Sequence, residues 1–220
     1  MILVVCATEL ELLPLLDLLP ADDAQWMSFV CGVGVVETTL HLSIFLAEQQ
    51  NTFTAVLHFG VAGAYIAEAE TEVDLLDICM AEQELFGDFG ICHRDHFEAL
   101  PDHLVHKSTY NLDSTLLQNC LGVLEEQNIP CRQGVFVTVA GVSATAERGR
   151  QLKNQYDALC ENMEGAAVAR VCEEFSIPLV EMRCISNFVE DRNLSRWKLN
   201  DACQRAAVVA AKLLQELIKR

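Results

Sequence analysis

Two polar side chains in the last third of the chain have types and positions suited to a binding site. Glu164 ends an irregular stretch and opens a predicted helix whose first turn, 165–167, is Gly-Ala-Ala, so the backbone can pack closely behind it. Asn187 ends an apolar run that is typical of a central strand. A carboxylate and an amide that face one cavity can bind a ribose and the edge of a purine. The pair therefore indicates nucleoside chemistry.

A third candidate, Glu11, lies near the start of the chain, in the first turn of a predicted helix. It is flanked by Leu10, Leu12 and Leu13. An apolar surrounding raises the pKa of a carboxyl group and suits it to act as a general base. An acidic residue in a first helical turn also stabilises the helix dipole. The residue types alone leave both interpretations open.

A metal site is the alternative that the histidines raise. The segment 86–97 and the residues after it contain Cys92, His93, Arg94, Asp95, His96, His103 and His106. Their spacing follows no familiar ligand pattern, so the sequence favours a solvated loop without a metal.

The elements that must position these side chains alternate along the chain. Strands are predicted at 2–7, 55–60, 75–81 and 134–139 and after Pro178. Helices are predicted at 9–18, 36–48, 114–127, 145–155, 164–175 and 199–218, with a glycine turn at 32–34. This order predicts a single α/β domain over 1–220, with a twisted, mixed but mostly parallel sheet between helices. Ligands of such folds lie beyond the carboxyl ends of the strands, where we expect Glu11, Gly60, Glu164 and Asn187.

Composition excludes several classes of function. The 220 residues are 51% hydrophobic and carry a formal net charge of -17, which argues against a nucleic-acid or acidic-membrane partner. Ten cysteines occur singly, without a CxxC pair, as expected of core thiols in a reducing cytoplasm. The apolar run 2–7 is too short for a signal peptide or a membrane span, so we expect a cytoplasmic protein.

Several motifs together carry a resemblance. They are Ala-Thr-Glu-Leu-Glu at 7–11, Gly-Val-Gly at 32–34, Phe-Gly-Val-Ala-Gly at 59–63, Gly-Asp-Phe-Gly at 87–90, Asn-Met-Glu-Gly-Ala-Ala at 162–167 and Arg-Cys-Ile-Ser-Asn at 183–187. In this order the chain resembles the nucleoside phosphorylase/nucleosidase superfamily and, within it, the bacterial futalosine hydrolases. The resemblance implies a three-layer sandwich of the nucleoside phosphorylase type, no cofactor or metal, and a homodimer or larger homo-oligomer.

The resemblance also implies roles for single residues. Glu11 would activate water, Glu164 would bind the ribose and Met163 would pack against the sugar. Asn187 stands where relatives that act on 6-aminopurines have an acid, and its amide suits hypoxanthine or guanine over adenine. Other residues of the expected substrate pocket are Val61, Ala62, Gly63, Val142, Phe86 and Phe89. Arg94 or Arg192 could pair with a substrate carboxylate, across a subunit contact or within one chain.

The implied activity is hydrolysis of futalosine to hypoxanthine and dehypoxanthine futalosine, a step of menaquinone biosynthesis. Water is favoured over phosphate because Val61 replaces a Ser or Thr found in some relatives, and because no arginine stands near the N-terminal loop. The alternatives are a methylthioadenosine/S-adenosylhomocysteine nucleosidase, a 6-oxopurine nucleoside phosphorylase, and a nucleoside-binding protein without turnover.

Overall fold

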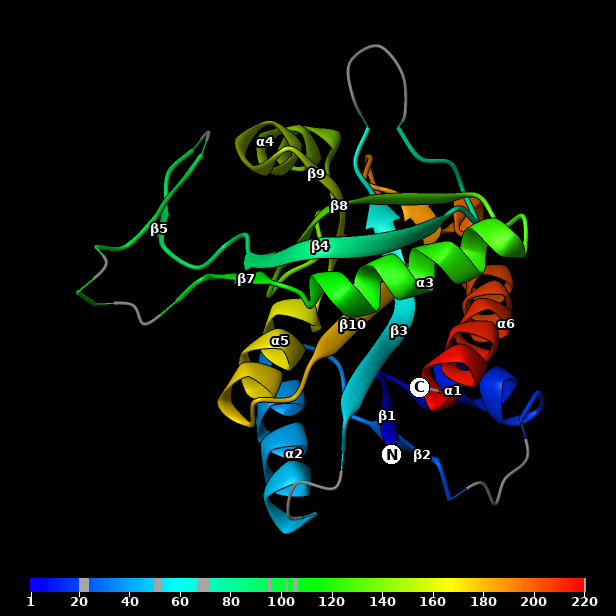
Figure 1. Cartoon of the computed structure of the whole chain (residues 1–220). Coiled ribbons are helices and arrows are strands. Elements are labelled where there is room, and N and C mark those ends of the chain that lie inside the picture. Colours follow the sequence, from blue (N-terminus) through cyan, green and yellow to red (C-terminus); the bar gives the residue numbers. More distant parts are fainter. Residues whose placement is uncertain are drawn as a thin grey trace.

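The computed structural model describes residues 1–19, 24–49, 53–66, 72–94, 96–101, 103–104 and 107–219 (Figure 1). Asp95 and His106 lie outside these ranges. The strands are β1 (Ile2–Cys6), β2 (Trp26–Val30), β3 (Ala55–Ala64), β4 (Ile78–Phe86), β5 (Ile91–Cys92), β6 (Phe97–Glu98), β7 (Thr109–Asn111), β8 (Cys131–Thr138), β9 (Ala158–Asn162) and β10 (Leu179–Phe188). The helices are α1 (Glu9–Leu16), α2 (Val35–Glu48), α3 (Ser114–Glu126), α4 (Ala146–Tyr156), α5 (Gly165–Glu174) and α6 (Leu199–Ile218), with a short 3-10 helix η1 (Leu194–Arg196).

The main sheet is mixed and mostly parallel, as expected. Parallel pairs join β1 to β2 and β3, β3 to β10, and β8 to β4 and β9. Antiparallel pairs join β4 to β10 and β7, and β3 to β9. Because β10 pairs with both β3 and β4, the order β10-β4-β8-β9-β3 closes on itself, while β1 and β2 extend it from β3. The closed ring brings the ends of β3, β9 and β10 together.

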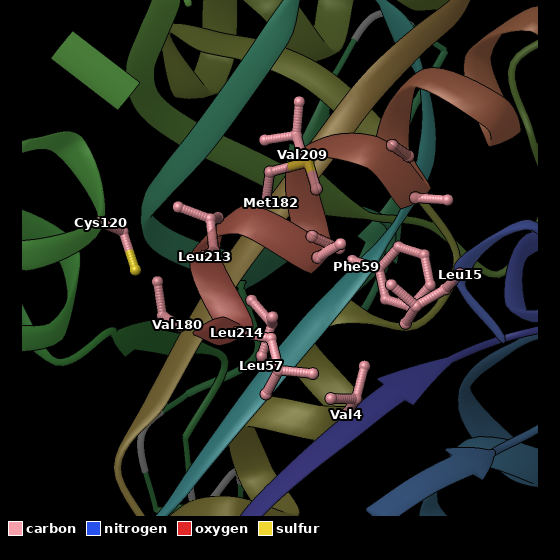
Figure 2. Close-up of a cluster of buried hydrophobic side chains, with 14 of the residues drawn as sticks. Val4, Leu15, Leu57, Phe59, Cys120, Val180, Met182, Val209, Leu213 and Leu214 are labelled. Carbon is pink, nitrogen blue, oxygen red and sulfur yellow. The ribbon is translucent and has the colours of Figure 1, made fainter. Parts of the chain in front are cut away.

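Helices cover both faces of this sheet. In Figure 1, α1 and α6 lie together on one side of β3, and α2 and α5 lie together on the other. Alternate residues of β1 enter the two layers: Val4 packs with the α6 side and Val5 with the α2 side. Figure 2 shows the first layer, in which Leu213 and Leu214 of α6 pack near Leu57. Strands buried on both faces explain the continuous apolar runs of the sequence.

Some boundaries differ from those predicted. The stretch before Glu164 is not irregular: it is strand β9, whose last residues Glu161 and Asn162 are polar but buried. The strand predicted at 75–81 begins at Ile78 and continues to Phe86. Strand β2 was not predicted. Its sequence shows no alternation of apolar and polar residues, and only Trp26 at its start is buried. Among the described residues, no helix combines the length and the apolar character that a membrane span requires.

Candidate active site

A cavity of about 220 Å³ lies where β3, β9 and β10 end beside the first turns of α1 and α5. Most of the residues expected in a substrate pocket line it: Glu11, Val61, Ala62, Gly63, Val142, Met163, Glu164 and Asn187. The structure thus brings together side chains that are far apart in the sequence.

Glu11 is buried at the start of α1, where its side chain caps the helix. Its Oε2 accepts hydrogen bonds from the backbone nitrogens of Ala7 (3.1 Å) and Thr8 (3.0 Å), which completes a capping box. Its Oε1 accepts from the backbone nitrogen of Val61 (3.1 Å) and keeps a free lone pair. Glu11 therefore caps the helix and also lines the cavity.

The apolar surrounding expected around Glu11 is formed only in part. Leu10 lines the cavity, but Leu12 packs into the core and Leu13 is exposed. Successive helical residues point in different directions, so three neighbours in sequence cannot form one wall. The carboxylate is held by backbone donors instead.

Glu164 is fixed from two sides. Its Oε1 accepts from the backbone nitrogen of Gly34 (3.0 Å), and its Oε2 lies 3.8 Å from Nη1 of Arg183. Asn162 Oδ1 accepts from the backbone nitrogens of Glu164 (2.9 Å) and Gly165 (2.7 Å), so Asn162 satisfies the first donors of α5. The Glu164 side chain makes no capping bond of its own and remains available to a ligand.

Arg183 is buried behind the cavity among acidic groups. Its Nε donates to Glu181 Oε1 (2.8 Å), and its Nη2 lies 3.0 Å from Nε2 of His58. Burial alone would lower the pKa of Arg183, but the carboxylates of Glu181, Glu164 and Glu11 raise it above the ordinary value. The guanidinium thus stays charged beside the carboxylates of Glu164 and Glu11.

A glycine makes this arrangement possible. A Cβ on Gly60 would lie 2.5 Å from Glu11 Oε1 and 2.7 Å from Arg183 Nη1. Only a residue without a side chain lets the carboxylate and the guanidinium approach β3 so closely.

Asn187 follows Arg183 by four residues on β10 and lines the cavity. Its Oδ1 accepts from the hydroxyl of Ser186 (2.9 Å), and its Nδ2 donates to the carbonyl of Phe188 (3.2 Å). An amide has two donor hydrogens and two acceptor lone pairs, so one of each remains for a ligand. A Cβ on Gly63 would lie 3.0 Å from Asn187 Nδ2, which explains the glycine.

The cavity also contains residues that no motif of the sequence singled out. Glu161, Ser186 and Trp197 line it. Glu161 comes directly before the Asn-Met-Glu motif, and this position could have indicated it. The sequence did not predict strand β9, which places its side chain in the cavity. Trp197 lies in the loop before α6, where no local pattern indicates a site.

Two aromatic residues expected in the substrate pocket lie elsewhere in the single chain. Phe86 and Phe89 face each other with ring centroids 6.2 Å apart, and neither lines the cavity. The carbonyl of Arg94 accepts from Gln151 Nε2 (3.2 Å), away from the cavity residues. Arg192, in contrast, stacks over the ring of Trp197 at 5.3 Å, and Trp197 lines the cavity. Of the two arginines, Arg192 is the one beside the cavity.

Among the described residues, one group could be considered as metal ligands: His93, His96 and Glu98, on the hairpin that extends from the body in Figure 1. The two imidazole rings are stacked at 4.4 Å and are nearly parallel. Ring nitrogens bind metals in the plane of the ring, so parallel stacked rings do not converge on one ion. Nε2 of His93 instead lies 2.9 Å from Oε2 of Glu98, within hydrogen-bond distance.

The ring of strands, the helices on both faces and the cavity at the strand ends, which three carboxylates line, define a single α/β fold with a candidate active site at the ends of its strands. A family model described as the Phosphorylase superfamily matches residues 24–219. The chain therefore belongs to the phosphorylase superfamily.

Individual relatives carry different names. The chain is 28% identical to the futalosine hydrolase of Thermus thermophilus over 84% of this chain and 79% of that protein. It is 25% identical to the 5'-methylthioadenosine/S-adenosylhomocysteine nucleosidase of Staphylococcus epidermidis over 73% of this chain and 68% of that protein. The solved structure of a futalosine hydrolase mutant of Helicobacter pylori superposes with a TM-score of 0.85 at 22% identity and covers 98% of each chain. That likeness confirms the expected fold.

Proposed function

We propose that this protein is a purine nucleosidase that splits the N-glycosidic bond with water, and that its substrate is futalosine. One observation carries the proposal: Glu11, Glu164 and Asn187 line a single cavity, with Glu11 and Glu164 held near one buried guanidinium. Hydrolysis of such a bond passes through a cationic sugar, which neighbouring carboxylates stabilise.

In the proposed reaction, the free lone pair of Glu11 Oε1 accepts a hydrogen bond from the attacking water. The bond between the sugar and the purine breaks and its electron pair goes to the base. The water oxygen then bonds to the anomeric carbon, and its proton goes to Glu11. Glu164 accepts hydrogen bonds from the ribose hydroxyls and faces the positive charge of the ring. Met163 lines the sugar side.

Asn187 supports the departing base without protonating it. An amide does not ionise, so the proton that neutralises the base comes from solvent. The free NH of Asn187 donates to an acceptor on the purine, and the free lone pair of its Oδ1 accepts from a protonated ring nitrogen.

Water is preferred over phosphate as the acceptor because the charge of Arg183 is already paired with carboxylates. A phosphorolytic enzyme needs a cation that is free to bind a dianion. Arg183 does not line the cavity, and it already faces Glu181, Glu164 and Glu11. The acidic cavity would repel phosphate.

The second candidate is a methylthioadenosine/S-adenosylhomocysteine nucleosidase, which the relative from Staphylococcus epidermidis supports. Asn187 favours futalosine, because a 6-oxopurine can leave with hydrogen bonds alone while adenine gains more from an acid. The relative from Thermus thermophilus supports the same choice. On this reading the products are hypoxanthine and dehypoxanthine futalosine, and the reaction is a step of menaquinone biosynthesis.

We further propose that the protein is a single-domain cytoplasmic homo-oligomer. All ten cysteines are free thiols, which suits a reducing compartment. The exposed residues Val36, Leu40 and Ile44 form an apolar stripe along α2, next to Val33 of the cavity. A second subunit that covers this stripe would lie beside the cavity and could complete the pocket for the 5′ group.

The test is base release, followed by liquid chromatography in phosphate-free buffer, from futalosine, inosine and methylthioadenosine side by side. Hypoxanthine from futalosine is the expected product. Adenine from methylthioadenosine as the main product would establish the second candidate. Release only after phosphate is added would identify a phosphorylase, and tight binding of futalosine without release would identify a binding protein.

A further inference from the structure

Glu161 and Asn187 stand on either side of Gly63 in one row of the sheet. Glu161 of β9 is in register with Gly63 of β3, and Gly63 is in register with Asn187 of β10. Residues in register on neighbouring strands project to the same face, and two strand spacings separate the outer two by roughly 10 Å. All three line the cavity. Gly63, in the middle of the row, has no side chain, and a polar side chain stands on each side of it.

The carboxylate of Glu161 is held in place by fixed donors. Its Oε2 accepts from the hydroxyls of Ser143 (2.6 Å) and Tyr65 (3.2 Å), and its Oε1 accepts from the backbone nitrogen of Ser143 (2.7 Å). Oε1 therefore keeps a lone pair. Arg148 in turn donates to the Ser143 hydroxyl (3.2 Å). Glu161 is oriented by its neighbours and cannot turn away from the cavity without breaking these bonds.

The electrostatic state of Glu161 favours a further donor. Burial raises the pKa of Glu161 above the ordinary value, although the donors of Ser143 and Tyr65 oppose the shift. A buried carboxylate gains free energy from each additional hydrogen bond that it accepts. A ligand that brings an N–H to Oε1 would supply that bond.

The two ends of this row match the edge of a 6-oxopurine. Such a base carries a donor at N1 and acceptors at O6 and N7. An N1–H can donate to a carboxylate, while the amide of Asn187 can donate to O6 or N7. A 6-aminopurine has a lone pair at N1, which an ionised carboxylate repels.

We propose that Glu161 binds the N1–H of the purine and selects 6-oxopurines over 6-aminopurines. The inference rests on the proposed function and deepens it, because it names a second residue that reads the base, opposite Asn187. Glu161 is thus a specificity-determining residue of the cavity.

The competing explanation is that Glu161 only anchors the loop that carries Val142, through its two bonds to Ser143. The two roles differ in what they change. Loss of an anchor weakens both kinds of purine alike, whereas loss of a base contact changes their ratio.

The experiment compares Glu161→Gln, Glu161→Asp and Ser143→Ala with the wild type. The readouts are the dissociation constants of free hypoxanthine and adenine, by calorimetry, and kcat/KM for inosine and adenosine. Wild type is expected to prefer hypoxanthine. Glu161→Gln should reduce the preference roughly 10- to 100-fold, as for a lost hydrogen bond to a charged group. Glu161→Asp, which keeps the charge but withdraws it, should weaken hypoxanthine without improving adenine.

Ser143→Ala is the control, because it removes one bond between the loop and Glu161 but keeps the carboxylate and its bonds from the backbone nitrogen of residue 143 and from Tyr65. It should lower both affinities and leave their ratio unchanged. The inference is overturned if Glu161→Gln keeps the wild-type ratio, or if the wild type binds adenine as well as hypoxanthine. Binding of the free bases tests Glu161 without any turnover. Failure of the proposed function would appear separately, as the absence of base release from every nucleoside.

Discussion

Arg183 approaches Glu164 from behind the cavity, with its Nη1 3.8 Å from Glu164 Oε2, while its Nε holds Glu181 at 2.8 Å. One buried cation thus links a carboxylate of the cavity to a carboxylate of the interior. Burial would raise the pKa of Glu181, but Arg183 and His58 lower it to about 2. The positive charge beside Glu164 is therefore balanced by Glu181, a carboxylate that does not line the cavity.

Replacing Arg183 should destabilise the fold as well as the site. Arg183→Met leaves Glu181 buried without its ion-pair partner, which costs about 3–5 kcal/mol. Urea unfolding followed by circular dichroism measures the loss. The double variant Arg183→Met with Glu181→Met should recover much of this stability but not the activity. A single variant as stable as the wild type would contradict the account of the buried pair.

Replacing Glu11 should affect catalysis more than folding. Glu11→Gln keeps the size of the side chain but removes the base, and we expect kcat to fall roughly 10²- to 10⁴-fold. The weakened capping box should cost no more than about 2 kcal/mol. Initial rates of hypoxanthine release measure the first effect and thermal unfolding the second. Glu9→Gln, an exposed change in the same helical turn, is the matched control and should behave as the wild type.

Replacing Asn187 with an acidic residue should shift the activity from 6-oxopurine towards 6-aminopurine nucleosides. Asn187→Asp adds a group that can protonate a leaving adenine, so activity on methylthioadenosine should rise relative to inosine. The Ser186 hydroxyl would still donate to one carboxylate oxygen, as it donates to Oδ1 of the amide. Competition between the two substrates in one tube gives the ratio of kcat/KM values directly. A ratio unchanged from the wild type would remove Asn187 as a base selector.

Glu84 should make stability depend on pH. Burial, and then the charge of Glu181, raise the pKa of Glu84 well above the ordinary value. A raised pKa in the folded state means that its contribution is fully present below the ordinary carboxyl pKa and is lost as pH rises towards and through the folded pKa. Glu84→Gln keeps a neutral side chain that can still bond to Thr138 and Asn162.

The variant should therefore lose less unfolding free energy than the wild type when pH is raised from about 5 to about 8. Urea titrations at several pH values measure the two slopes. Exposed Glu82→Gln, from the same strand, is the control and should follow the wild type. Parallel slopes for Glu84→Gln and wild type would show that Glu84 is ionised in the fold.

The local motifs predicted much of the cavity because each lies at the end of one element. Asn162 to Gly165 is a cap, and Glu11 completes a capping box, so short-range geometry decides both. Long-range pairing was not predictable in this way. The closure of β10 onto β3 and β4 depends on register between distant segments, and it alone sets Glu161 opposite Asn187.

The position of β9 and that of Phe86 differ from the prediction for physical reasons. A buried polar strand end such as β9 lacks the apolar alternation that marks a strand, because its side chains are satisfied by Tyr65, Ser143 and Glu84 far away in sequence. Phe86 is the last residue of β4, and this strand ends away from the cavity, where Phe86 packs against Tyr110.

The central claim is that water, held by Glu11, breaks the bond between the sugar and a 6-oxopurine. The most direct test is turnover of futalosine in water enriched in the heavy oxygen isotope, with mass analysis of both products. One heavy oxygen is expected at the anomeric carbon of the sugar product and none in hypoxanthine. A sugar product that carries phosphate, or release of base without heavy oxygen in the sugar, would contradict it.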